Sequence, residues 1–191
     1  MSSLSPTAER LCNAAIRHFA EVGYEGGSLN EIATNVGIRK ASLYSHFRGK
    51  DELFLAALSV ALEVEQTFVA GAFAQPVSDG AGSAYVLAIE ERYPASPHLR
   101  FLLRAAYLLP KSIATQVGAG YEGFLALLRQ HYLDQLDVNR PGLAKADRDC
   151  FAEAYVGIVE SLFVELTYGN PKAMAARRDA LWRILSLAVA S

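Results

Sequence analysis

The segment from residue 28 to residue 47 carries the side chains with the clearest chemical use. Its second half holds two cations, three hydroxyl groups, an alanine and a histidine, namely Arg39, Lys40, Ala41, Ser42, Tyr44, Ser45 and His46. No Asp or Glu occurs between Glu31 and Asp51. This pattern suits a helix that enters the major groove of DNA, because phosphates repel carboxylates and bulky aliphatic side chains block base edges. An ordinary helical hairpin with a solvated polar face is the alternative interpretation.

The same segment has the layout of a helix-turn-helix. Ser28 precedes the first short helix, and Glu31 follows at the capping-box spacing. Gly37 permits a tight turn before the second helix. The side chains expected to pack between the two helices are Ile32, Ala33, Val36, Ile38, Leu43 and Phe47.

Apolar residues recur at three- and four-residue intervals along most of the chain, and alternating strand patterns are missing. Gly and Pro divide this pattern into about nine helices. We therefore predict an all-α protein with a three-helix N-terminal domain over residues 1–49. A helical domain follows over residues 50–191 and begins with a long connecting helix over 50–74.

Composition argues against several other classes of protein. Hydrophobic residues make up 52% of the chain and charged residues 20%, so a core can be buried and wholesale disorder is excluded. The two cysteines, Cys12 and Cys150, are too far apart in sequence for a disulfide framework, and we expect both to be small core residues. The four histidines are dispersed, so we expect no metal site.

Catalytic and membrane-spanning signals are missing as well. The chain contains neither a nucleophile elbow nor a glycine-rich phosphate loop, so we expect no enzyme activity and no cofactor. The longest apolar run, Leu53 to Leu62, is shorter than the ~20 residues that a bilayer requires. Without a secretory signal, the expected location is the cytoplasm.

Residues 7–55 resemble the N-terminal domain of the TetR family of bacterial transcriptional regulators. The matching stretches are Phe19-Ala-Glu-Val-Gly-Tyr, Ser28-Leu-Asn-Glu-Ile-Ala, Val36-Gly-Ile-Arg-Lys-Ala-Ser-Leu-Tyr-Ser-His-Phe and Lys50-Asp-Glu-Leu-Phe. Beyond residue 55 the resemblance extends only to length and helical character. It implies a DNA-binding N-terminal domain followed by a ligand-binding and dimerisation domain, without a cofactor.

The resemblance also implies roles for individual residues toward DNA. Tyr44 and His46 match positions that meet the phosphate backbone, as do Ser28 at a helix start and Lys50 at the start of the fourth helix. The positions that approach bases are Lys40, Ala41, Ser42 and Ser45, with Arg39 beside them. The family often has Gly or Pro at position 41 and a large side chain at position 45. Because this chain has neither, few direct base contacts are expected, and much of the specificity would come from DNA shape.

The second domain has two candidate surfaces. Arg100 and Arg104 share a helix face with Tyr107, and with Tyr121 and Glu160 they form the candidate ligand site, where an acidic or aromatic amphiphile is expected. Two solvated arginines are the alternative. In the family the last two helices, here about 145–168 and 171–190, form the dimer interface. The candidate interface residues are Tyr155, Ile158, Leu162, Leu166, Leu181 and Leu185, although one chain could bury them in its own core.

The sequence therefore predicts a homodimeric DNA-binding transcriptional regulator. A repressor that a small-molecule effector releases from a palindromic double-stranded operator is the expected form, since this is the commonest behaviour in the family. A regulator without ligand response is one alternative. A small helical enzyme or carrier with an incidental helix-turn-helix is another.

Overall fold

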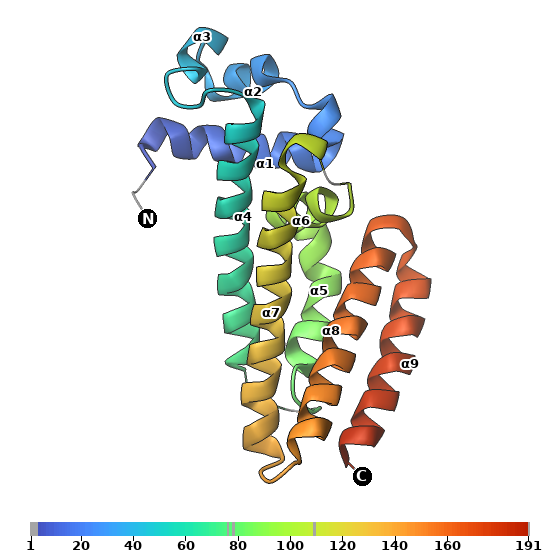
Figure 1. The fold of residues 1–191 in the computed structure, drawn as a ribbon. Helices are drawn as coiled ribbons and strands as arrows, with labels where there is room; N and C mark the ends of the chain where they lie inside the picture. The colour runs from blue at the N-terminus through green and yellow to red at the C-terminus, as the bar shows by residue number, and fades with distance from the viewer. Residues whose placement is uncertain (1–3, 76, 78, 109, 191) are drawn as a thin grey trace. The chain divides into compact units, whose positions relative to one another are not determined.

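The computed structural model describes residues 4–75, 77, 79–108 and 110–190 (Figure 1). These residues form nine α-helices and one 3₁₀ turn without any strand, which confirms the all-α prediction. The helices are α1 (Pro6–Gly26), α2 (Leu29–Val36), α3 (Lys40–Leu43), α4 (Lys50–Phe73), α5 (Ser83–Ala95), α6 (Pro97–Tyr107), α7 (Ala114–Asn139), α8 (Lys145–Tyr168) and α9 (Pro171–Ala190), with the 3₁₀ turn η1 (Lys111–Ile113) before α7.

The chain divides into two compact units. The first comprises Met1–Glu65 and Ser96–Glu122, and the second comprises Gln66–Ala95 and Gly123–Ser191. Two helices, α4 and α7, pass from one unit to the other along the chain. The predicted domain boundary at residue 49 stays a prediction.

Ser5 and Pro6 start helix α1, and Gly23 breaks it. The Ser5 hydroxyl accepts a hydrogen bond from the Ala8 N–H at 3.3 Å, and Pro6 occupies the first helical position. Gly23 interrupts the helix with φ +73°, a conformation that costs glycine little. Gly23 therefore breaks α1, and the helix continues for three more residues to Gly26.

An aromatic cluster forms much of the core of the first unit. The Phe54 ring on α4 meets Phe19 of α1 and Phe101 of α6 edge to face, with both pairs of ring centroids 4.9 Å apart. Tyr24 packs edge to face on Phe54 at 5.3 Å. Edge-to-face aromatic pairs stabilise a fold beyond the area that they bury. This cluster therefore fixes α1, which supports the helix-turn-helix, against α4 and α6.

A buried carboxylate sits at the start of α6. Glu65 accepts a hydrogen bond of 2.7 Å from the Ser96 hydroxyl, which itself accepts one from the Leu99 N–H at 3.1 Å. Ser96 is thus the N-cap of α6 and a partner of Glu65 at once. These bonds offset part of the cost of burying the carboxyl group.

The second unit contains α5, α8, α9 and the C-terminal parts of α4 and α7. Its centre is the fully buried Tyr155 of α8, whose ring stacks on Tyr132 of α7 at 4.4 Å. Phe73 and Trp182 meet the Tyr155 ring edge to face at 6.1 and 6.5 Å. Tyr155 is therefore held from several sides.

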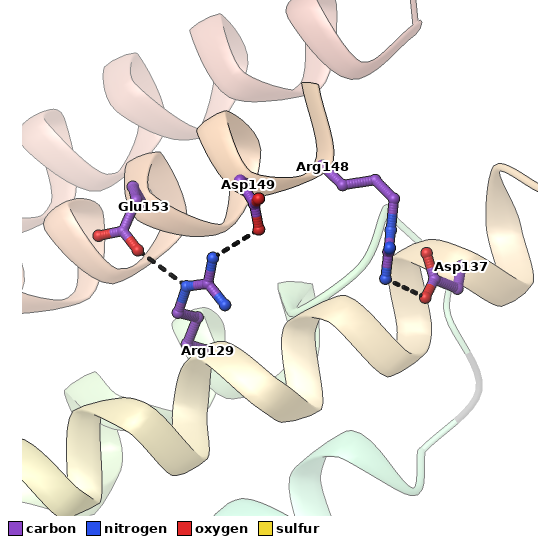
Figure 2. Close-up of polar contacts among 5 residues, drawn as sticks. All are labelled: Arg129, Asp137, Arg148, Asp149 and Glu153. Atoms are coloured by element: carbon purple, nitrogen blue, oxygen red, sulfur yellow. Dashed lines mark hydrogen bonds and ion pairs between the residues drawn. The ribbon is translucent and has the colours of Figure 1, made fainter. Parts of the chain in front are cut away.

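Charged side chains join α7 to α8 (Figure 2). The Arg129 guanidinium donates hydrogen bonds of 2.8 Å to both Asp149 and Glu153 on α8. Farther along, Arg148 of α8 pairs with Asp137 of α7. The arginines come from opposite helices, so each helix contributes both donors and acceptors to this contact.

Helix α4 has the length and composition of a membrane span, with a mean hydropathy of 1.6 over its most apolar window. The sequence prediction considered only the uninterrupted run from Leu53 to Leu62 and did not find this longer window. Leu53, Phe54 and Ala57 are buried in the first unit. A helix that lies in a protein core has the same composition, so the hydropathy of α4 does not indicate a membrane.

The two cysteines differ in environment. Cys12 is buried, as expected, and burial raises the pKa of its thiol to about 11. Cys150 is exposed near the start of α8, so the prediction that it is a core residue was wrong. Cys150 directly precedes the half-buried Phe151. Because successive residues of a helix point in different directions, the Cys150 side chain faces solvent.

Candidate nucleic-acid interface

Helix α2 is held at its N-terminus by residues from two helices. The Ser28 hydroxyl accepts a hydrogen bond from the Glu31 N–H at 3.3 Å, as the capping-box spacing predicts. Glu31 does not complete the box. The Ser28 N–H instead donates to Nε2 of His18 at 3.0 Å, while Nδ1 of His18 lies 3.8 Å from the Glu31 carboxylate. The bond to Nε2 places the proton of a neutral His18 ring on Nδ1.

His18 thus links α1 to α2, a role that no sequence pattern indicates. Arg10 provides a second link, since its guanidinium donates to the Val36 carbonyl oxygen at 2.7 Å. One consequence concerns the Ser28 N–H, for which the family resemblance implied a phosphate contact. That N–H already has a partner in His18.

The turn and core of the helix-turn-helix agree with the sequence prediction. Gly37 adopts φ +78° and ψ +26°, and its N–H donates to the carbonyl oxygens of the last turn of α2. A non-glycine residue rarely adopts this left-handed conformation. The buried side chains are Ile32, Ala33, Val36, Leu43 and Phe47, while Ile38 is half-buried.

Helix α3 is short, and its outer face is exposed. It covers Lys40–Leu43 only, after which Tyr44, Ser45 and His46 continue in turn conformation. The exposed residues on and beside it are Arg39, Lys40, Ala41, Ser42, Tyr44 and Ser45, whereas His46 is half-buried. Tyr44 has 49% of its surface exposed although it is aromatic. Within the described part of the chain, Arg39 and Lys40 form no ion pair, so both cations are available to an external anion.

Lys50 has internal partners at the start of α4. Its Nζ lies 4.5 Å from the centre of the Tyr24 ring and donates to the Glu25 carbonyl oxygen at 3.3 Å. The Tyr24 hydroxyl donates to the Asp51 carboxylate and lies 3.4 Å from the Ser112 hydroxyl. Burial and the bond to Asp51 raise the pKa of Tyr24. Lys50 therefore helps to fix the end of α1 on α4, in addition to any phosphate contact.

The five predicted ligand residues are distributed over both units. Arg100, Arg104 and Tyr107 lie on α6 and Tyr121 on α7, all in the first unit, whereas Glu160 lies on α8 in the second. The hydroxyls of Tyr107 and Tyr121 are 3.3 Å apart.

Arg104 packs on the break in α1. Its Nε would be 3.0 Å from a Cβ at Gly23, and this buried nitrogen has no hydrogen-bond partner within the described part of the chain. The cavity beside it has a volume of about 10 Å³. That volume accommodates roughly one water molecule, so this arrangement has no room for an aromatic ligand next to Arg104.

Most of the predicted dimer residues lie inside the second unit. Tyr155, Ile158, Leu162 and Leu185 are buried in the protomer itself, and Leu166 and Leu181 are half-buried. The exposed apolar side chains on the same two helices are Val164, Tyr168, Ile184 and Leu187. The assignment of the predicted residues to a dimer interface stays a prediction.

Comparisons with known proteins bear on both units. Residues 11–57 match the family model for bacterial regulatory proteins of the tetR family. Over 46 residues the chain is 41% identical to the biofilm operon icaADBC HTH-type negative transcriptional regulator IcaR of Staphylococcus epidermidis and 44% identical to IcaR of Staphylococcus aureus. This match covers 24% of the chain, which spans about a quarter (25%) of the length of these relatives.

The fold as a whole is that of solved TetR structures. A tetR-family regulator from Streptomyces coelicolor superimposes with a TM-score of 0.74 at 18% identity over 98% of this chain and 84% of its own. Residues 11–57 thus carry a TetR-family sequence, and the described residues have the TetR fold. AibR, solved with isovaleryl coenzyme A and operator DNA, has the same fold with a TM-score of 0.63 at 18% identity, covering 93% of this chain and 97% of AibR. Within the TetR fold, α2 and α3 occupy the helix-turn-helix.

Proposed function

We propose that this TetR family member is a sequence-specific DNA-binding transcriptional regulator that acts in the cytoplasm as a repressor. The observation that supports this function most directly is the outer face of α3. Six exposed residues present cations, hydroxyls and one methyl group without any carboxylate, above a core that fixes the helix. IcaR, which shares this segment, is a negative transcriptional regulator, and AibR was solved with operator DNA.

The exposed residues divide by their chemistry into two roles. Arg39, Lys40 and the hydroxyl of Tyr44 would bind phosphates, which sets the register of the protein on the duplex. The small Ala41 and Ser42 would approach base edges in the major groove. The Ser45 hydroxyl donates its one proton to the Ser42 carbonyl oxygen at 2.7 Å, so in this arrangement it offers a base only an acceptor. Few direct base contacts then remain, so DNA shape would supply much of the specificity.

A homodimer would place two such faces on one palindromic operator. Ile184 and Leu187 on α9 have 65% and 64% of their surface exposed, and Val164 and Tyr168 add apolar area on α8. Helices α8 and α9 lie side by side in the second unit, so these four side chains can contribute to a common surface. Two recognition helices in successive major grooves would lie ~34 Å apart.

A small-molecule effector would release the operator by binding one conformation of the dimer more tightly than another. The ligand can shift this equilibrium only by its difference in affinity for the two conformations. The long helix α4 begins at Lys50 beside the DNA-binding domain and continues into the second unit, so it is the element that we expect to respond.

Selection from a randomised pool of double-stranded DNA tests the proposed function. The wild-type protein should enrich a palindromic sequence, and its affinity for that DNA should fall steeply with salt. Lys40→Ala should weaken binding and reduce the salt slope by about one unit. Lys172→Ala removes another exposed lysine, at the start of α9, and should leave both quantities unchanged. Failure to enrich any sequence would contradict the proposal.

A further inference from the structure

The second unit contains a cavity of about 410 Å³ that is distinct from the predicted ligand residues. It lies between the C-terminal parts of α7 and α9 and residues 77 and 79–81. Tyr132, Leu136 and Leu185 form its inner end, since all three are buried, while Asp79 and Asn139 at the rim are exposed. Small-molecule sites have volumes of roughly 300–1,000 Å³, so this cavity has room for a small organic ligand.

The aromatic wall of the cavity is rigid. Trp182 and Tyr132 both pack on the fully buried Tyr155, at 6.5 and 4.4 Å between ring centroids. Trp182, Leu185 and Val189 recur at the spacing that places side chains on one face of a helix. An apolar ligand would therefore meet a preformed surface and would lose little free energy in ordering side chains.

Hydrogen bonds fix the segment that closes the cavity. The Trp182 indole N–H donates to Asp79 at 3.3 Å. Gln135 accepts from the Gly82 N–H at 2.9 Å and donates to the Phe73 carbonyl oxygen at 2.5 Å, so it joins the two ends of the connection between α4 and α5. These contacts fix the position of residues that line the cavity.

Two polar groups that line the cavity lack partners among the described residues. Arg140 follows α7 directly, is half-buried, and forms no ion pair there. The Tyr132 hydroxyl has no hydrogen-bond partner among the residues that the structure describes, and burial raises the pKa of this group to about 12, so it remains a donor at neutral pH. An unpaired, half-buried guanidinium is costly, and a carboxylate would supply charge-assisted hydrogen bonds to it.

We propose that this cavity binds a small carboxylate with an apolar body, held by Arg140 at the rim and packed against Trp182 and Tyr132. Arg140 and the Tyr132 hydroxyl supply the donors, and the buried leucines accommodate the apolar chain. As a binding site, the cavity does not depend on DNA recognition. As the effector site of the regulator, it rests on the proposed function.

Trp182 makes a direct assay possible, because it is the only tryptophan in the chain. The full-length protein is titrated with octanoate, octanamide and octylammonium while tryptophan fluorescence is recorded. These probes share an apolar chain and differ in the charge of the head group. Octanoate should give a saturable change, with an affinity about tenfold or more above that of octanamide, which is typical for a hydrogen-bonded charge.

Variants then assign the charge selectivity to Arg140. Arg140→Gln should reduce octanoate affinity about tenfold and leave octanamide binding nearly unchanged. Arg183→Gln removes an exposed arginine next to Trp182 that does not line the cavity, and it should behave as the wild type. Equal affinities for the three probes, preference for octylammonium, or equal losses in the two variants would overturn the proposed site.

The effector role is tested separately by fluorescence anisotropy with the selected DNA. Octanoate should release DNA from the wild type at concentrations about tenfold below those that Arg140→Gln requires. Octanoate binding without any release would overturn the effector role. Absence of DNA binding before octanoate is added would contradict the proposed function, and the fluorescence titration would still decide on the site.

Discussion

Gly82→Ala should destabilise the second unit, because a side chain at this position would collide with the buried Tyr155 ring. Gly82 adopts φ +78°, and a Cβ there would lie 2.4 Å from Cε2 of Tyr155 and 2.7 Å from its Cζ. Tyr155 cannot retreat easily, because its ring stacks on Tyr132 at 4.4 Å and meets Phe73 and Trp182 on other sides.

Two separate contributions determine how much Gly82→Ala lowers the free energy of unfolding. A non-glycine residue in the left-handed region costs about 1–2 kcal/mol. Overpacking a well-filled core adds about 1–3 kcal/mol. We therefore expect Gly82→Ala to lower the free energy of unfolding by about 2–5 kcal/mol. Gly142→Ala isolates the backbone contribution, since Gly142 has φ +97° and its Cβ would have no neighbour within 4 Å.

Urea unfolding at a fixed protein concentration, followed by circular dichroism and by Trp182 fluorescence, measures both variants. Gly142→Ala should lose only about 1–2 kcal/mol. The difference between the variants is the cost of the contact with Tyr155. A Gly82→Ala protein that is as stable as Gly142→Ala would refute the reasoning, because the contact would then cost nothing. Gly82→Ala should also weaken octanoate binding, since Tyr155 supports the aromatic wall of the cavity.

Three further predictions concern the surface and the thiols. Ile184→Glu should give a folded monomer by light scattering and circular dichroism, whereas Leu185→Glu, 5% exposed, should not fold; a folded dimer in the first case would contradict the proposed dimer surface. Alkylation at mildly alkaline pH should modify Cys150 alone, because burial raises the pKa of Cys12 to about 11, and mass spectrometry should detect a second modification only after unfolding. Arg129→Gln should lower the urea midpoint slightly at low salt, and high salt should remove most of this effect, since its two carboxylate partners are largely exposed.

Local chemistry explains the features that the sequence predicted correctly. Ser28 caps α2 because its hydroxyl reaches an N–H three residues away, and Gly37 terminates that helix because only glycine adopts its backbone angles cheaply. The core of the helix-turn-helix followed from spacing alone, since Ile32 and Val36 lie one turn apart on one face. Each of these inferences needs only residues that are close in the chain.

Contacts between distant segments were decided by the tertiary structure. The capping-box spacing could not reveal that His18, on another helix, takes the Ser28 N–H in place of Glu31. Periodicity identified the apolar faces of α8 and α9 but not their partners, and Leu162 and Leu185 proved to be buried in the protomer itself. A helix with apolar residues around most of its circumference presents several faces, and only packing determines which one remains exposed.

The cavity beside Trp182 is the clearest example of this difference. Its polar groups, Arg140 and Tyr132, carry no motif in the sequence, and Asp79 reaches Trp182 across more than one hundred residues. The sequence by itself determined the helical class, the DNA-binding segment and its turn, because these depend on local capping, periodicity and side-chain type. The tertiary structure decided which arginine lines a ligand-sized space, because a cavity is defined by the side chains that fail to fill it.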